Sequence, residues 1–335
     1  MNIAIVGATG NVGRKILEVL ERKKLSINEL FLVASSRSAG QKLNFNDKEH
    51  EVFNLETFDF SKVQITFFAA GGKISEQYAA KAAKHSTVID NSSFYRMDPD
   101  VPLIVPQVNP EAIKNIKKNI IANPNCSTTQ LVIALKPLHD LFNIERIVVS
   151  TYQSVSGSGK DSMDELIAQT KLYLKNKEIK SKNFTKQIAF NAIPQIDVFA
   201  DDGYTKEELK MANETKKILD EKIELTATCV RIPVLVSHAE SVNVQFEKSF
   251  SLEKVRDALG KAEGCELYDS REDGGYSTPI EAEGKNETYI SRIRNDKSNK
   301  NSLNLWIVSD NLLRGAALNA VEIAEILIKN NFDGQ

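Results

Sequence analysis

The sequence predicts an α/β protein in which a parallel sheet occupies the first part of the chain and a mixed sheet lies in a second, α+β domain. Three observations lead to this fold class. An apolar strand runs into a glycine-rich turn and a helix at residues 2–20. Strands and helical segments then alternate as far as residue 126, the order that builds a parallel sheet with helices on both faces. Later in the chain, segments of alternating apolar and polar residues indicate strands of a partly antiparallel sheet.

Composition places the chain among ordinary globular proteins, and its 335 residues suffice for two domains. The 43 basic and 45 acidic side chains give a net charge of −2, which favours neither nucleic acid nor an anionic membrane as a partner. No run reaches the roughly 18 apolar residues of a membrane span, and the start MNIAIVGATG lacks a signal-peptide pattern, so we expect a cytoplasmic protein. The three cysteines show no CxxC spacing, so neither a metal site nor a disulfide framework is predicted.

The N-terminal glycine turn predicts a dinucleotide site. Strand Asn2–Val6 leads into GATGNVG, and a helix follows with Val12, Ile16 and Leu20 at four-residue spacing. GxxGxxG is a variant of the fingerprint whose glycines let backbone approach a pyrophosphate while the helix N-terminus supplies N–H donors. Between a strand and a helix, the motif favours this function over a plain turn and makes the domain Rossmann-like. The expected cofactor-binding residues of the turn are Gly7, Thr9, Gly10, Asn11, Val12 and Gly13.

The end of the second strand predicts which dinucleotide binds. Strand Leu30–Ala34 is followed by the tripeptide Ser36-Arg37-Ser38, where an NAD site would place an acidic residue for the ribose 2′-hydroxyl. Hydroxyls and an arginine suit a 2′-phosphate, so NADP is preferred over NAD. The alternative is an arginine in a solvated loop. The next expected strand, Val63–Ala69, leads to Gly71, where backbone can again approach the cofactor.

A lone cysteine stands in NPNCSTTQ, between the strand Asn119–Ala122 and the apolar helix Leu131–Leu141. Asn125 can cap this helix, so the Cys126 thiol would lie in the first turn, where free N–H groups and the helix dipole favour an anion. The pKa of a thiol so placed can fall from about 8.5 to roughly 3.5–7.5, which makes it a usable nucleophile. The alternative is a small buried residue in a tight turn, and the local sequence does not decide between them.

Two further segments follow predicted strands and carry polar side chains. Arg96 comes after strand Thr87–Asp90, at the edge where such sheets bind ligands, and is a candidate anion binder. The Ser- and Gly-rich run 151–160 follows strand Glu145–Ser150. Such a run suits a loop lining a ligand cleft and equally a flexible turn.

Charged residues in the second half also stand out. Glu207 and Lys210 lie three apart on a predicted helix and share one face, as an exposed ion pair would. Arg231 lies on the apolar strand Leu225–Pro233, where a fixed charge needs a partner and an anionic ligand would supply one. His238 precedes an alternating strand, and a lone histidine in that position is more often structural than catalytic.

Eight motifs along the chain are GATGNVG, SSFYR, VPQVNP, NPNCSTTQ, YQSVSGSG, EELKM, RIPVLVSHAE and DNLLRGAALNA. Together they resemble the signatures of the aspartate-β-semialdehyde dehydrogenase family, in the same order and over nearly the whole chain. DNLLRGAA departs from the commoner DNLRKGAA, and AAGGK carries a lysine where serine is commoner. A relative in mechanism, N-acetyl-γ-glutamyl-phosphate reductase, usually has a glycine before its cysteine, where this chain has Asn125.

The resemblance implies a role for each candidate residue. Cys126 would be the acyl-thioester nucleophile and His238 the acid/base, while Gln153 would position the substrate and the thioester. The implied substrate contacts are Arg231 for the α-carboxylate, Glu207 for the amino group, Arg96 and Lys210 for the phosphate, and Asn125 beside the nucleophile. The NADP site would also include Ser36, Arg37, Ser38, Gly71, Ser156, Gly157 and Asn311.

The implied reaction is the reversible, NADP-dependent reductive dephosphorylation of L-aspartyl 4-phosphate to L-aspartate 4-semialdehyde. It serves the biosynthesis of lysine (through diaminopimelate), threonine and methionine, with inorganic phosphate as the other small-molecule partner. The implied organisation is an NADP-binding domain of residues 1–126 and 311–335 and a catalytic and dimerisation domain of residues 127–310, in a homodimer or homotetramer. Two alternatives stay open: N-acetyl-γ-glutamyl-phosphate reductase, and a non-catalytic NADP-binding regulator, which would have no need of both Cys126 and His238.

Overall fold

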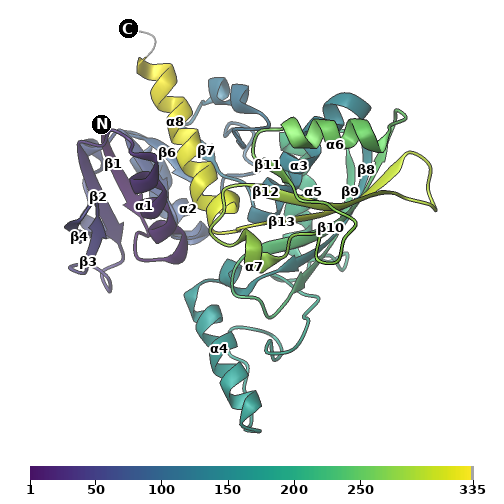
Figure 1. Cartoon of the computed structure of the whole chain (residues 1–335). Helices are drawn as coiled ribbons and strands as arrows, with labels where there is room; N and C mark the ends of the chain where they lie inside the picture. Colours follow the sequence, from purple (N-terminus) through teal and green to yellow (C-terminus); the bar gives the residue numbers. More distant parts are fainter. Residues whose placement is uncertain (333–335) are drawn as a thin grey trace. The chain divides into compact units, whose positions relative to one another are not determined.

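The computed structural model describes residues 1–332, which form two compact units (Figure 1). Unit 1 is Met1–Asn125 together with the segment that begins at Ala316, and unit 2 is Cys126–Gly315. The predicted division assigned residues 127–310 to the second domain. Residues 333–335 of the predicted NADP-binding domain lie outside the described part of the chain.

Unit 1 has the predicted Rossmann-like architecture, with seven strands in the order β3-β4-β2-β1-β5-β6-β7. Every neighbouring pair is parallel except β3 and β4. The central strands are apolar and buried, as strands covered on both faces must be. The elements are β1 (Asn2–Val6), α1 (Asn11–Lys23), β2 (Glu29–Ala34), β3 (Lys42–Phe45), β4 (Lys48–Asn54), β5 (Ile65–Phe68), α2 (Gly72–Ala82), β6 (Thr87–Asp90), β7 (Ile120–Ala122) and α8 (Leu318–Phe332).

The sequence prediction passed from the second strand to the strand near residue 65 and missed the hairpin of β3 and β4. These strands are joined by Asn46 and Asp47, which both have positive φ (49° and 61°), as a two-residue hairpin turn of this kind requires. β4 then pairs in parallel with β2 and widens the sheet. An Asn-Asp pair between two short alternating segments was the signal that could have revealed the hairpin.

The cofactor candidates of unit 1 lie at the point where the chain changes direction across the sheet. β2 adds on one side of β1, and β5 adds on the other. Right-handed crossovers therefore place α1 and α2 on opposite faces, while α8 packs along α1 and against β6. Open α/β sheets bind ligands at this switch point, outside the carboxyl ends of the strands. Gly7 directly follows β1, and Gly71 lies three residues after the end of β5.

Unit 2 contains the predicted mixed sheet, in the order β11-β12-β13-β10-β8-β9. The β11–β12 and β8–β9 pairs are parallel and the other three are antiparallel. β8 runs to Gln153, so the first three residues of the predicted loop 151–160 belong to a strand. The elements are α3 (Cys126–Phe142), β8 (Ile144–Gln153), α4 (Lys160–Leu174), α5 (Lys206–Ile218), β9 (Glu224–Arg231), β10 (His238–Phe246), α6 (Leu252–Lys261), β11 (Cys265–Leu267), α7 (Pro279–Ala282), β12 (Thr288–Asn295) and β13 (Ser302–Ser309).

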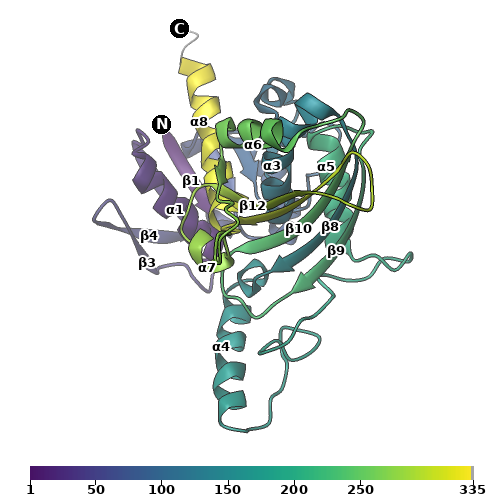
Figure 2. The same cartoon turned by 45° about the vertical axis from the view of Figure 1, so that its right-hand side comes forward.

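One face of the mixed sheet carries α3, α5 and α6, and the short helix α7 lies against β13 (Figures 1 and 2). Figure 2 shows α4 extending away from this sheet. Leu131, Leu135 and Leu138 of α3 recur at helical spacing and are fully buried in the core between helix and sheet. The core also contains Cys229 of β9. The N-terminus of α3 is therefore held firmly over the strands beneath it.

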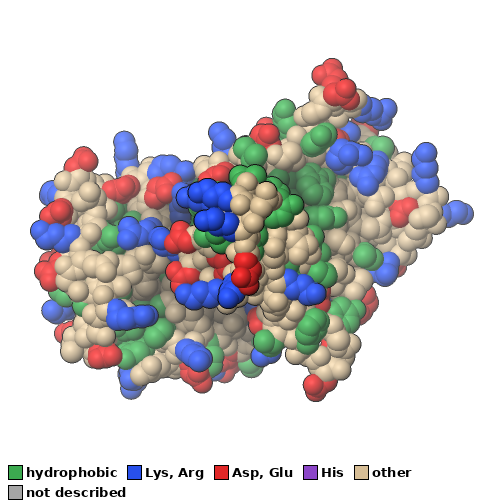
Figure 3. Space-filling model, turned by 90° about the horizontal axis from the view of Figure 1, so that it is seen from below, with side chains coloured by type: hydrophobic (Ala, Val, Ile, Leu, Met, Phe, Trp, Pro, Cys, Tyr) green, Lys and Arg blue, Asp and Glu red, His purple; other side chains and the backbone are tan. Residues whose placement is uncertain are grey.

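The charged surface agrees with the balanced composition. Figure 3 shows lysine and arginine side chains interspersed with aspartate and glutamate over one face, in keeping with the net charge of −2. No helix formed by residues 1–332 combines the length and the apolar character needed to cross a bilayer.

Candidate active site

The glycine turn of unit 1 is built from backbone that tolerates no side chain. Gly7 has φ of +86°, and a Cβ added there would lie 2.6 Å from the carbonyl oxygen of Ala69. A Cβ on Gly13 would lie 2.2 Å from the carbonyl oxygen of Gly7. The N–H of Gly10 donates to that same Gly7 carbonyl at 3.0 Å, and α1 begins at the next residue. Tight backbone and a helix N-terminus without a side-chain cap, both at the switch point, fit the pyrophosphate of a dinucleotide.

The loop after β2 lies beside this turn. The hydroxyl of Thr9 donates to the hydroxyl of Ser38 at 3.5 Å, which brings the glycine turn and the predicted 2′-phosphate loop together. Arg37 is exposed in that loop, so its guanidinium is accessible to a ligand. Gly71, at the start of α2, has φ of +85° and open space where a side chain would stand. The residues present therefore fit a dinucleotide.

Arg96 is buried, and its guanidinium is fixed to backbone. Its Nε donates to the carbonyl oxygen of Asn123 and its Nη2 to that of Asn91, both at 2.9 Å. Burial raises the pKa of the Asp90 carboxyl, although hydrogen bonds from Ser92 and the charge of Arg96 oppose the shift. Arg96 is thus rigidly tied to the segment that leads to the buried Asn125 and then to Cys126.

In unit 2 the strand register brings three predicted residues into one row. Gln153 of β8 lies opposite Arg231 of β9, and the pairing of Ala239 with Tyr152 sets His238 of β10 on the other side of Gln153. All three side chains are at most 5% exposed. We call Arg231, Gln153 and His238 the central row. Residues 78 and 85 positions apart thus become neighbours through register alone (231 − 153 and 238 − 153).

The central row faces the start of α3, whose first residue is Cys126. Gln153 makes the connection, because its Nε2 donates to the hydroxyl of Ser127 at 2.8 Å and to Oε1 of Glu207 at 3.3 Å. Burial lowers the pKa of Arg231, while the negative charges of Glu207 and Cys126 act against that shift. The nucleophile candidate, the amide and the guanidinium therefore belong to one electrostatic cluster.

Arg231 is held in position by backbone. Its Nη1 donates to the carbonyl oxygen of Ser154 at 2.6 Å. A Cβ built on Gly157 would lie 3.1 Å from this Nη1 and 3.3 Å from Nε2 of His238. Gly157 therefore sits directly against both polar groups, which brings its loop into the predicted site.

Glu207 and Lys210 form a half-buried ionic group on α5. Thr205 and Glu208 make a reciprocal capping box at the helix start, which fixes the turn that contains Glu207. The Lys210 ammonium is 2.8 Å from Asp197 and 3.2 Å from Glu207. Burial alone would lower the pKa of Lys210, but the two carboxylates outweigh it and raise that pKa. This pair is more than the exposed ion pair considered from the sequence, because Glu207 is buried and also contacts Gln153.

His238 is completely buried as the first residue of β10. Its Nδ1 accepts a hydrogen bond from the backbone N–H of Ser154 at 3.1 Å, and the Ser154 hydroxyl is equally close to it. Burial lowers the pKa of His238 to about 3, and the positive charge of Arg231 adds to the shift. Nε2 makes no hydrogen bond with any described residue, although it is buried. An imidazole with one nitrogen anchored and the other unsatisfied is arranged to contact a ligand.

Asn311 joins the loops around this histidine. Its Oδ1 accepts hydrogen bonds from the Ser154 and Ser156 hydroxyls at 3.1 Å and from the N–H of Ser237 at 2.8 Å. Its Nδ2 donates to Ser156 at 3.0 Å. The predicted cofactor residues Ser156 and Asn311 therefore also organise the surroundings of His238.

Two residues of this site were missed by reasoning from the sequence. Ser154 belongs to the Ser- and Gly-rich run but was not singled out, and its contact with His238 depends on tertiary structure. Gly315 lies directly against the nucleophile: a Cβ there would be 2.7 Å from Cβ of Cys126. The turn after Asp310, whose Oδ1 accepts from the N–H groups of Leu312 and Leu313, leads the chain to this contact. The signal for Gly315 was the run of small residues in RGAA.

Glu240 was also missed, and it lies on β10 just beyond His238. Glu240 is fully buried opposite Thr151, two residues after His238, and neither carboxyl oxygen makes a hydrogen bond with a described residue. Burial raises the pKa of Glu240 well above its ordinary value, and only the nearby Gln130 amide opposes this. Gln130 lies one helical turn after Cys126 on α3. A second polar layer therefore lies beneath the catalytic candidates.

Comparison with known proteins agrees with this organisation. Residues 2–116 match the family described as semialdehyde dehydrogenase, NAD binding domain, and residues 135–314 match semialdehyde dehydrogenase, dimerisation domain. These matches cover most of unit 1 and unit 2 in turn.

Whole-length relatives are similar to the chain from end to end. It is 52% identical over 332 residues to aspartate-semialdehyde dehydrogenase of Aquifex aeolicus, and this match covers 98% of each chain. It is 50% identical to aspartate-semialdehyde dehydrogenase 2 of Vibrio cholerae, in a match that covers 99% of this chain and 98% of the relative. The crystal structure of the Vibrio cholerae enzyme II complexed with ASA covers 99% of each chain with a TM-score of 0.96 and 49% identity. The crystal structure of aspartate semialdehyde dehydrogenase with NADP from Candida albicans matches with a TM-score of 0.75 and 25% identity, over 98% of this chain and 99% of that chain. The chain thus belongs to the aspartate-semialdehyde dehydrogenase family of enzymes.

Proposed function

We propose that the protein catalyses the NADP-dependent, reversible reductive dephosphorylation of L-aspartyl 4-phosphate to L-aspartate 4-semialdehyde, through a thioester on Cys126. The observation that carries this proposal is the central row, which sets a guanidinium, an amide and an imidazole side by side and faces the turn that holds Cys126. The product would serve lysine, threonine and methionine biosynthesis.

Substrate recognition follows from the charges available. Arg231 is buried and offers its guanidinium to the α-carboxylate, while the Glu207 carboxylate accepts from the substrate amino group. Asn125 and Gln153 orient the reacting carbonyl. The phosphate is bound by Arg96 and by Lys210, whose ammonium would exchange part of its contact with Asp197 for the more highly charged anion.

A cysteine thiolate suits both the acyl transfer and the reduction that this reaction requires. The Cys126 thiolate adds to the acyl phosphate, phosphate leaves, and the resulting thioester is activated towards hydride far more than an oxygen ester would be. NADPH, when bound, supplies that hydride. His238 contacts the carbonyl oxygen on which negative charge develops, and loss of the thiolate then releases the aldehyde. The same residues perform the reverse reaction with inorganic phosphate as the attacking group.

The glycine turn supports a dinucleotide, and Arg37 with Ser36 and Ser38 supports NADP over NAD. The loop offers a cation and hydroxyls and no carboxylate where the ribose 2′-substituent of such cofactors lies. Ser156, Gly157 and Asn311 of unit 2 would contact the nicotinamide end, where the side chains of Ser156 and Asn311 are hydrogen-bonded to each other.

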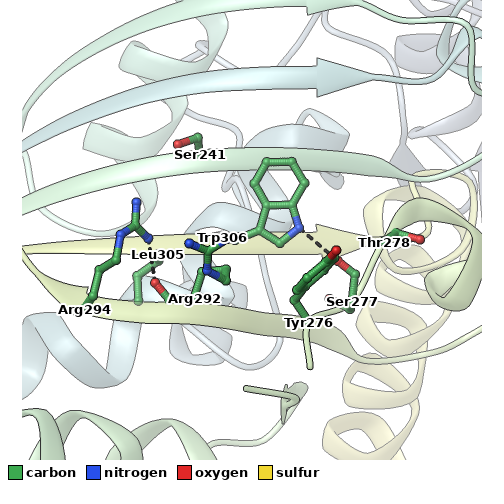
Figure 4. A pocket seen from close by; sticks show the side chains of 8 residues that line it. All are labelled: Ser241, Tyr276, Ser277, Thr278, Arg292, Arg294, Leu305 and Trp306. Carbon is green, nitrogen blue, oxygen red and sulfur yellow. Dashed lines mark hydrogen bonds between the residues drawn. The ribbon is translucent and has the colours of Figure 1, made fainter. Parts of the chain in front are cut away.

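We further propose that the protein forms a homodimer, or a homotetramer of such dimers, through unit 2. The face of its sheet opposite to α3, α5 and α6 has a pocket of about 260 Å³ between Tyr276 and Trp306. Arg292 and Arg294 lie beside this pocket (Figure 4). Trp306 also donates to the carbonyl oxygen of Ser277. A second copy would cover this apolar and cationic face. Light scattering should give a mass of at least twice 37.3 kDa, and a stable monomer at micromolar concentration would contradict the proposal.

The activity is tested by phosphate-dependent NADP reduction with L-aspartate semialdehyde and, separately, with N-acetylglutamate semialdehyde. We expect turnover with the first only, and mass spectrometry of quenched enzyme should find an aspartyl adduct on Cys126. Turnover with the second only would favour the acyl-phosphate reductase of arginine synthesis. Cofactor binding without turnover of either would favour the non-catalytic regulator.

A further inference from the structure

The ammonium of Lys210, a phosphate ligand in the proposed function, is held between two carboxylates. Its Nζ lies 2.8 Å from Oδ2 of Asp197 and 3.2 Å from Oε2 of Glu207. One ammonium and two carboxylates give these three side chains a net charge of −1 (1 − 2). A phosphate that approached all three would meet more negative than positive charge. One carboxylate must therefore give way before Lys210 can bind the anion.

The two carboxylates differ in how firmly they are held. The Glu207 side chain is only 8% exposed, and its Oε1 accepts a hydrogen bond from Gln153 at 3.3 Å. The Asp197 side chain is 34% exposed, so water can replace the ammonium as its partner. Losing a buried charge partner is far more unfavourable than losing one that solvent can replace. Asp197 is thus the carboxylate that gives way more easily.

Backbone contacts hold Asp197 beside the start of α5. Ile193 exchanges two backbone hydrogen bonds with Arg231, at 2.8 and 2.9 Å. The carbonyl oxygen of Val198 accepts from the N–H of Lys206 at 2.9 Å. Between these two anchors Asp197 has φ of +69°, a left-handed conformation that aspartate and asparagine adopt more readily than most residues. Its Oδ1 accepts from the N–H of Val198 at 2.9 Å, which leaves Oδ2 directed at the ammonium.

The Asp197–Lys210 pair is ionic and accessible. Burial raises the pKa of Asp197, but the hydrogen bonds from Lys210 and from the Val198 N–H outweigh it and lower that pKa. The Lys210 side chain is 25% exposed, so an anion from solvent can reach its ammonium. A carboxylate oxygen and a phosphate oxygen make the same kind of charge-assisted hydrogen bond with an ammonium. Asp197 and phosphate therefore compete for the same donor.

We propose that Asp197 is the exchangeable counter-ion of Lys210, which binds the ammonium in the absence of phosphate, is displaced when phosphate binds, and weakens phosphate binding by this competition. The inference rests on the proposed function, in which Lys210 binds the phosphate. It makes Asp197 a determinant of phosphate affinity alone, because the α-carboxylate and the amino group of the substrate are assigned to Arg231 and Glu207.

The competition has a use in the reductive direction. Phosphate leaves when the thioester forms, and it must depart before another acyl phosphate can bind. A carboxylate that recovers the ammonium favours this departure. Asp197 would therefore limit inhibition by the inorganic phosphate that the reaction releases.

The variant D197N tests the competition in phosphate-dependent NADP reduction with L-aspartate semialdehyde. Asparagine removes the charge, keeps an oxygen for the Val198 N–H and tolerates left-handed backbone. We expect KM for phosphate to fall about two- to fivefold, the range of a partly exposed ion pair, and KM for the semialdehyde to change by less than about 1.5-fold. The inhibition constant of phosphate in the reductive direction should fall by the same factor. D201N, which removes an exposed aspartate from the same loop, is the control and should change none of these constants.

A higher KM for phosphate in D197N would mean that Asp197 orients Lys210 for binding, and would overturn the proposal, as would an unchanged KM. Thermal unfolding verifies that D197N is folded. The competition also requires Lys210, so in a K210M background D197N should change KM for phosphate by less than about 1.5-fold. A full D197N effect in that background would mean direct repulsion of phosphate by Asp197 and would contradict the exchange.

The proposed function is tested separately by K210M alone. This variant should raise KM for phosphate by at least about tenfold, because it removes a charge-assisted hydrogen bond. If K210M left that constant unchanged, Lys210 would not be a phosphate ligand and this part of the proposed function would fail. That outcome differs from a normal K210M effect accompanied by an unchanged or raised constant in D197N, which would overturn only the role of Asp197.

Discussion

The glycine turn of unit 1 and the central row of unit 2 both prepare a place for charged groups, but by different means. The turn uses seven consecutive residues, 7–13, and works through backbone that a side chain would obstruct. The central row uses side chains from three strands, beginning at Gln153 and ending at His238, and works through strand register. The first device is local in the chain and the second is not.

The two devices also differ in what they bury. In the turn, the donors are backbone N–H groups at the start of α1, which carry only partial charges. In the central row, Arg231 and His238 are ionisable groups that are nearly or completely buried. Such groups must be fixed by specific partners, which explains why Ser154, Gly157 and Asn311 surround them. Substitutions in the two regions should therefore fail in different ways.

The largest effect is expected at the residue that faces the central row. C126S should lower turnover by roughly 10⁴-fold or more, because a serine hydroxyl lacks the acidity and nucleophilicity of the thiol. NADP affinity, measured by fluorescence titration, should remain near wild type, since the glycine turn is unchanged. Full activity in C126S would refute covalent catalysis.

The next effect tests close packing against the nucleophile. G315A would place a Cβ 2.7 Å from Cβ of Cys126, so the start of α3 must shift. We expect kcat to fall by about 10²-fold, as small displacements of a reacting group do, with little change in NADP affinity. The matched control is G260A in α6, where an added Cβ has open space and alanine is the better helix former. Equal kcat values for the two variants would show that the Gly315 contact is unimportant.

A smaller effect is expected at the cofactor loop. R37A should raise KM for NADP by about 10–100-fold, the value of one or two charge-assisted hydrogen bonds, and KM for NAD by less than about threefold. R271A removes another exposed arginine, in the turn that follows β11, and serves as the control. An equal effect of R37A on both cofactors would remove Arg37 from recognition of the 2′-phosphate.

The smallest effect is expected on thermal stability, from the buried carboxyl of Glu240 next to the central row. Burial raises the folded-state pKa of Glu240 above its ordinary value of 4.5, so the folded protein holds this proton more tightly than the unfolded chain. Stability from this site is fully present below about pH 4.5 and is lost as pH rises from there towards the folded-state pKa. E240Q stays neutral and should raise Tm by a few degrees at pH 8 (on the order of 1 kcal/mol), and by less at pH 5. Exposed Glu221→Gln is the control, and a Tm difference that does not grow with pH would contradict the burial of a neutral carboxyl.

The sequence by itself determined the fold class, the glycine turn and the thiol at the start of α3. These features depend on residues close together in the chain: apolar periodicity, glycine conformation and the free N–H groups of a helix end. It also contained a signal for the β3–β4 hairpin, the Asn46-Asp47 turn, which is equally local. Family motifs indicated Arg231, Gln153 and His238, although the local reading of His238 favoured a structural role.

Only the tertiary structure decided which groups act on one another. Register set His238 beside Gln153 and placed Glu240 opposite Thr151, and a shift of one residue would have turned all of them to the other face. The turn after Asp310 led Gly315 to Cys126, and the loop after β8 brought the Ser154 N–H to Nδ1 of His238. Protonation states depend on such contacts and on burial, neither of which any stretch of neighbouring residues specifies.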